Sequence, residues 1–145
     1  MRALLIALLL FPGSGANIAI YAQTPEWRTV AVPGSTTTNA GFAWFRCFVK
    51  LPAEWQGRDL TFAVEAIGTA HEAYLNGAKI GGAGKFPPNY QDGSDAGGRY
   101  ALPPDKTRFN DWNLIAIRVY DHDREGPFHG AAPLIGTDKD RKSVV

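Results

Sequence analysis

The stretch AHEAYLNGAKI, residues 70–80, decides the fold of this chain. Its centre is Asn76-Gly77, a dipeptide that readily adopts the two positive φ angles of a type I′ turn. A turn of this kind joins two antiparallel strands directly, and the segments on either side have the length of short strands. The stretch therefore predicts a β-hairpin.

The segment 44–51, which precedes the hairpin, alternates with period two. Successive side chains of a strand point to opposite faces, so the odd-numbered residues, which are all apolar, are expected to face the core. The even-numbered residues include Trp44 and Phe48, whose large rings also need to be covered by a second sheet, a loop or a ligand. The residues expected to face the core are Phe45, Cys47, Val49 and Leu51.

Further apolar alternations recur along the chain, separated by clusters of Gly, Pro, Asn or Asp. This spacing favours an all-β sandwich or barrel, and no segment carries a convincing helical stripe. The segment 112–120 is apolar on both faces and is predicted to be a central strand. Residues 81–98 predict a long surface loop, a kind of segment that often carries function. The other predicted strands are residues 27–32, 60–66 and 99–103.

The N-terminus has the composition of a secretory signal peptide: Arg2 is followed by an apolar run that ends at Pro12-Gly13. The run is shorter than the roughly 20 residues that a membrane-spanning helix needs. We expect residues 1–22 to be a leader that is cleaved after Ala22, so that the mature chain starts at Gln23. The protein is therefore expected to be secreted or periplasmic, with no membrane attachment after cleavage.

The remainder has the size of one domain, expected over residues 23–137, with a charged tail at 138–145. The full chain has 15 Lys and Arg residues against 14 Asp and Glu residues. This balance does not suggest nucleic acid as a partner, because nucleic acid needs a clustered basic surface. The single cysteine, Cys47, excludes an internal disulfide and is expected to be a small buried hydrophobe.

A set of motifs in a fixed order identifies a resemblance to a known family. The chain resembles the sugar-binding domain of glycoside hydrolase family 2, and the resemblance spans Trp27–Gly136. The motifs are Trp44-Phe45-Arg46, Leu51-Pro52-Ala53-Glu54-Trp55, Tyr74-Leu75-Asn76-Gly77, Ile80-Gly81, Arg99-Tyr100 and Asn113-Leu114-Ile115-Ala116-Ile117-Arg118-Val119.

The resemblance implies an antiparallel jelly-roll β-sandwich with the galactose-binding-like fold, which stands at the N-terminus of β-galactosidases and is also appended to secreted esterases. In those glycosidases two catalytic glutamates lie on a separate downstream barrel, which this chain does not contain. We therefore expect a non-catalytic, carbohydrate-binding-like module. The alternatives are a truncated part of a glycoside hydrolase or esterase, active only with a missing domain or partner, and a sandwich that binds a protein and no sugar.

No catalytic pair stands out among the acidic residues. Glycoside hydrolysis needs two carboxyl groups about 5 to 10 Å apart. Glu65 and Glu72 could lie on adjacent strands, but adjacent strands of any sheet bring acidic residues together by accident. Neither Ser35 nor Ser94 lies in a Gly-x-Ser-x-Gly motif. The run Asp121-His122-Asp123 cannot supply the six to eight oxygens that calcium needs, so no metal and no cofactor is expected.

A sugar site would combine an aromatic ring with nearby polar side chains. The best local cluster lies in the loop 84–98, where Asn89, Tyr90, Gln91 and Asp92 follow one another. Tyr74, Phe128 and Arg118 are further possible contributors. The residues predicted to bind sugar are Tyr90, Asn89, Asp92, Trp112, His71, Glu72, Asp121 and His122.

Overall fold

The structure is a computed structural model that describes residues 2–8, 18–23, 29–32, 41–65, 67, 69–93, 98–121, 128 and 133–137. Apart from one short 3-10 turn, η1 (Ala53–Trp55), every regular element in this part of the chain is a strand. The strands are β1 (Arg2–Leu8), β2 (Ile18–Gln23), β3 (Thr29–Val32), β4 (Gly41–Lys50), β5 (Leu60–Val64), β6 (Ala70–Leu75), β7 (Ala78–Ala83), β8 (Gly98–Ala101), β9 (Trp112–Asp121) and β10 (Leu134–Thr137).

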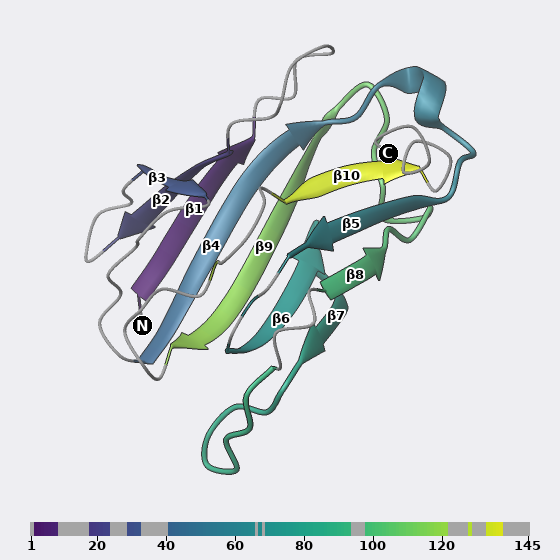
Figure 1. Cartoon of the computed structure of the whole chain (residues 1–145). Helices are drawn as coiled ribbons and strands as arrows, with labels where there is room; N and C mark the ends of the chain where they lie inside the picture. The colour runs from purple at the N-terminus through teal and green to yellow at the C-terminus, as the bar shows by residue number, and fades with distance from the viewer. Residues whose placement is uncertain are drawn as a thin grey trace.

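The strands form two sheets (Figure 1). The large sheet has the order β3-β2-β1-β4-β9-β6-β7, and the small sheet has the order β10-β5-β8. Neighbouring strands are antiparallel, except that β1 pairs with β4 in parallel at Arg2 and Ala3. In Figure 1 the small sheet lies on the side of β9, β6 and β7, and β1–β3 lie on the other side of β4. The predicted all-β, jelly-roll β-sandwich is confirmed.

The core lies between the two sheets and contains the residues that the alternation assigned to it. From β4, Phe45, Cys47 and Val49 are at most 4% exposed, and Leu51 is fully buried. The small sheet contributes Leu60, Phe62 and Val64, and β9 contributes Ile115, Ile117 and Val119. The sandwich is therefore held by apolar packing of alternate side chains from both sheets.

The hairpin forms as predicted: β6 pairs with β7 around Asn76 (φ 48°) and Gly77 (φ 87°). The Asn76 side chain also anchors the turn to the next strand. Its Nδ2 donates to the Lys106 carbonyl at 2.7 Å and to Asn113 Oδ1 at 2.9 Å, and its Oδ1 accepts the Leu114 N–H at 2.8 Å. These bonds fix the hairpin against β9.

Other strand predictions agree with the structure to within a few residues. The strand β9 pairs with β4 on one side and β6 on the other, so its predicted central position is confirmed. The predicted loop 81–98 is shorter, because β7 continues to Ala83 and Lys85 and Gln91 exchange two backbone hydrogen bonds of 2.9 and 3.0 Å. The expected tail, residues 138–145, lies outside the described residues.

The expected leader coincides with the outermost strands of the large sheet. Cleavage after Ala22 would remove β1 and all of β2 except Gln23. The described pairings do not test cleavage, so the leader stays a prediction.

Candidate functional site

We call the side of the large sheet that faces away from the core the outer face. It carries an unusual set of side chains. Because the odd-numbered residues of β4 and β9 point into the core, the even-numbered ones point outward. The register places β6 beside β9, so Glu72 lies beside Arg118 and Tyr74 beside Ala116. The outer face comprises Phe42, Trp44, Arg46, Phe48, Lys50, Glu72, Tyr74, Lys79, Trp112, Leu114, Ala116, Arg118 and Tyr120.

Arg118 occupies the aromatic end of the outer face. Its guanidinium carbon lies 4.3 Å from the Phe42 ring centroid and 4.7 Å from that of Phe86. Trp44 is a more distant neighbour at 5.9 Å. Cation–π contacts of this kind hold a guanidinium in place and leave its edge for hydrogen bonding.

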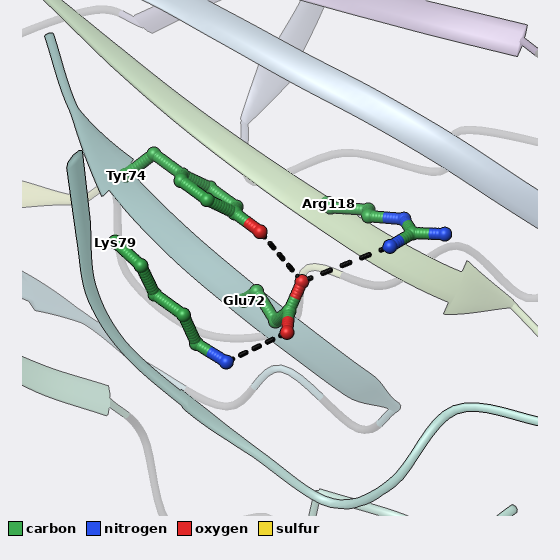
Figure 2. A network of polar contacts seen from close by, with 4 residues as sticks. All are labelled: Glu72, Tyr74, Lys79 and Arg118. Atoms are coloured by element: carbon green, nitrogen blue, oxygen red, sulfur yellow. Dashed lines mark hydrogen bonds and ion pairs between the residues drawn. The ribbon is translucent and has the colours of Figure 1, made fainter. Parts of the chain in front are cut away.

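Glu72 is the centre of a polar network drawn from three strands (Figure 2). One carboxylate oxygen accepts a hydrogen bond from Tyr74 Oη at 2.6 Å, and the other contacts Lys79 Nζ at 2.6 Å. Arg118 Nη1 lies 3.8 Å from the first oxygen. Tyr74, Lys79 and Arg118 all point toward the carboxylate in Figure 2.

The network fixes the protonation state of Glu72. Partial burial alone would raise the pKa of this carboxyl group, but hydrogen bonds from Lys79 and Tyr74 and the charges of Lys79 and Arg118 lower it overall. Burial, followed by the hydrogen bond to Glu72 and its negative charge, raises the pKa of Tyr74 to about 12. At neutral pH Glu72 is therefore a carboxylate and Tyr74 a neutral hydrogen-bond donor.

The predicted loop cluster lies against the same end of the outer face. The Tyr90 ring packs 5.2 Å from the Tyr120 ring, and its hydroxyl donates to Asp92 Oδ1. Asn89 and Asp92 are exposed, and Phe86 of the same loop packs on Phe42 with ring centroids 5.2 Å apart. The structure thus brings Tyr90, Asp92 and their loop to the strands that carry Glu72 and Arg118.

The opposite end of the outer face exposes two large aromatic side chains. Phe48 is 43% exposed and Trp112 is 47% exposed. Trp112 and Tyr120 stand at the two ends of β9, about 26 Å apart at roughly 3.3 Å per residue. Trp112, which was predicted to bind sugar, therefore lies on the outer face but far from the cluster of Tyr90 and Asp92.

His71, another predicted sugar-binding residue, lies on the core side of the sheet. It is 2% exposed, its Nδ1 donates to the Thr69 carbonyl at 3.1 Å, and its Nε2 accepts from Tyr100 Oη at 2.5 Å. This bond joins β6 of the large sheet to β8 of the small sheet. Because adjacent strand residues point to opposite faces, His71 and Glu72 cannot line the same site.

The remaining candidates are only partly described. Asp121 ends β9 and pairs with Gly41, its side chain is not described, and His122 lies outside the described residues. Phe128 is buried against Phe45, with ring centroids 4.5 Å apart, and belongs to the core.

Glu65 and Glu72 do not lie on adjacent strands. Glu65 follows β5, which pairs with β8 and β10 in the small sheet, whereas Glu72 belongs to β6 in the large sheet. Among the described residues, no group of three or more His, Cys, Asp and Glu side chains could hold a metal ion. The described part of the chain also has no helix of the length and apolarity needed to span a membrane.

The sequence prediction omitted Trp44, Lys79 and Phe86 from the site and did not commit to Arg118. A signal for Trp44 was present in the alternation, because this ring points away from the core. Phe86 and Lys79 carry no such signal, because their places depend on how the loop and β7 pack against β9.

Comparisons with known proteins bear on the fold. No protein-family model matches the chain. No curated protein matches it either. Among solved structures, β-glucuronidase from Ruminococcus gnavus in complex with D-glucaro-d-lactam matches with a TM-score of 0.55 and 18% identity, over 66% of this chain and 17% of that chain. The same enzyme in complex with uronic isofagomine gives the same TM-score and identity, over 67% of this chain and 16% of that chain.

The chain thus spans less than a fifth of the length of the β-glucuronidase that it matches. At this identity the match concerns the fold alone. It supports the resemblance to glycoside hydrolase family 2 at the level of the β-sandwich, and the chain has the fold of a β-sandwich domain of such an enzyme.

Proposed function

We propose that this chain is a secreted, non-catalytic carbohydrate-binding module that works beside a sugar-cleaving enzyme. The observation that carries the proposal is the outer face, where partly exposed aromatic rings flank a cluster of hydrogen-bonding side chains. Aromatic rings pack against the apolar faces of sugar rings, and polar groups beside them bind the hydroxyls. Trp44 and Tyr74, whose ring centroids are 5.5 Å apart, lie directly beside Glu72 and Arg118.

The state of Glu72 supports a binding role over a catalytic one. A glycosidase needs a carboxyl group with a raised pKa as its general acid and a second carboxylate across the sugar bond. The pKa of Glu72 is lowered, and Glu72 is the only carboxylate on the described strands of the outer face. Its two cationic neighbours keep it ionised, so it can accept hydrogen bonds but is a poor acid.

The test is a titration of the purified chain with a panel of neutral and acidic polysaccharides, followed by tryptophan fluorescence. We expect saturable binding and no hydrolysis of chromogenic glycosides under the same conditions. The substitution Trp112→Ala removes an exposed ring and is expected to weaken binding about fivefold, corresponding to about 1 kcal/mol. The matched control is Leu134→Ala, because Leu134 is exposed to a similar extent (56% against 47% for Trp112) but belongs to the small sheet.

Each other outcome contradicts the proposal in a recognisable way. Turnover of a glycoside would make the chain an enzyme. Absence of binding to every saccharide would favour the alternative in which the outer face packs against a catalytic domain or another protein. Equal losses in the Trp112 and Leu134 variants would place the binding elsewhere.

A further inference from the structure

The charged residues of the outer face are strongly unequal in sign. Its described strands carry four basic side chains, Arg46, Lys50, Lys79 and Arg118, against the single carboxylate of Glu72. The chain as a whole has a net charge of only +1. The excess positive charge is therefore a local property of this face, and a cationic surface of this kind attracts anions.

The carboxylate of Glu72 is satisfied largely without Arg118. Lys79 and Tyr74 both contact it at 2.6 Å, whereas Arg118 Nη1 is at 3.8 Å, beyond ordinary hydrogen-bond distance. Arg118 Nε is buried and has no hydrogen-bond partner within the described part of the chain. Because Nε is buried, a ligand would pair with the terminal nitrogens of the guanidinium, of which Nη1 makes only the long contact to Glu72.

Arg118 is also held in a fixed position. Phe42 and Phe86 pack on it, and its side chain remains 30% exposed and points toward Glu72 (Figure 2). A planar guanidinium whose position is fixed binds a carboxylate through two parallel hydrogen bonds and loses little conformational entropy in doing so. The rings around it, together with Trp44, would contact the apolar face of the molecule that bears this carboxylate.

We propose that the outer face binds acidic polysaccharides, whose carboxylates pair with Arg118 and the neighbouring basic residues while their sugar rings pack on the aromatic side chains. This inference rests on the proposed function and names the substrate class of the same site. Neutral polysaccharides would use the rings alone and bind more weakly.

The test compares polygalacturonate with the same polymer after methyl esterification, which removes the charge and keeps the sugar. At low salt we expect at least tenfold tighter binding of the charged polymer, and we expect the difference to shrink as the salt concentration rises. Arg118→Gln is expected to remove most of the difference. Lys79→Gln, at a residue with a 54% exposed side chain, gives a second variant that is expected to fold and to reduce it. The matched control is Arg99→Gln, which makes the same change of charge at an exposed residue of the small sheet.

The outcomes separate this inference from the proposed function. Equal affinity for both polymers would overturn the inference and leave a neutral sugar module. Binding to neither polymer would overturn the inference, and only a failure to bind every polysaccharide of the panel would also overturn the proposed function. If polyglutamate bound as tightly as polygalacturonate, the outer face would be a general anion-binding surface. If Arg99→Gln reduced the difference between the two polymers as much as Arg118→Gln, the effect would be due to net charge alone. Either result would overturn the inference.

Discussion

The hydrogen bond between His71 and Tyr100 ties the two sheets together, and its removal is a sensitive test of the structure. His71 Nε2 and Tyr100 Oη lie 2.5 Å apart, and the two residues are 2% and 8% exposed. The Thr69 carbonyl can only accept a hydrogen bond, so His71 Nδ1 carries the proton and Nε2 is an acceptor. The substitution Tyr100→Phe leaves this acceptor buried without a donor.

A buried polar atom that loses its partner costs about 1–3 kcal/mol. The ring of Tyr100 remains in Tyr100→Phe and keeps its packing, so we expect a decrease of about 1–2 kcal/mol in the free energy of unfolding. With a urea m-value of about 1–3 kcal/mol/M, this decrease lowers the unfolding midpoint by roughly 1 M. Urea titrations at pH 7.5, followed by tryptophan fluorescence, measure the midpoint and the slope together.

The matched control is Tyr90→Phe, which also removes a tyrosine hydroxyl, but from the loop that follows β7. Tyr90 donates to the exposed Asp92, and water can replace this bond, so we expect a change below about 0.5 kcal/mol. A Tyr100 variant as stable as the wild type, or an equal loss in both variants, would refute the reasoning that this bond is buried between the sheets.

Three further predictions concern the turn, the pH dependence and the N-terminus. Asn76→Ala removes three hydrogen bonds and places alanine at φ 48°, so we expect the free energy of unfolding in urea to fall by about 2–4 kcal/mol. The control Asn89→Ala, at an exposed loop residue, is expected to lower it by less than about 0.5 kcal/mol. Burial lowers the pKa of His71, and the hydrogen bond to a carbonyl opposes this only in part, so the unfolded state takes up a proton at higher pH than the folded state. The stability contributed by neutral His71 is then fully present above about pH 6.5 and decreases as the pH falls below it, and a stability-against-pH curve that keeps the same slope in His71→Phe would contradict this assignment. If residues 1–22 are a leader, mass spectrometry of the exported protein should give a chain that starts at Gln23, whereas a retained Met1 would show that β1 and β2 belong to the mature sheet.

Much of the fold follows from local sequence. Asn76-Gly77 specifies the hairpin because its backbone angles depend on two residues alone, and the alternation in β4 identifies the core because period two is a property of any strand. The same rule shows why His71 was misplaced among the site residues. Composition assigned His71 and Glu72 to one site, but neighbouring residues of a strand face opposite sides of the sheet.

The candidate site could be predicted only in part, because four strands and a loop build it. Tyr90 and Asp92 are close in sequence and were found as a cluster. Arg118 and Phe86 are 32 positions apart, and they meet because β9 is central and the loop after β7 packs across its end. The order of the strands in the sheet decides such contacts, and this order cannot be predicted from the periodicity of the sequence.

The most direct test of the outer face as the binding surface is an NMR titration that follows the tryptophan indole N–H signals. Of the four tryptophans, Trp44 and Trp112 lie on the outer face and Trp55 packs against the core from η1, so Trp55 is an internal control; Trp27 lies outside the described residues. On addition of an oligogalacturonide we expect the signals of Trp44 and Trp112 to shift in a saturable manner while that of Trp55 stays in place. A shift confined to Trp55, or no shift at any of the three at saccharide concentrations that saturate the polymer assay, would contradict the assignment of binding to this face.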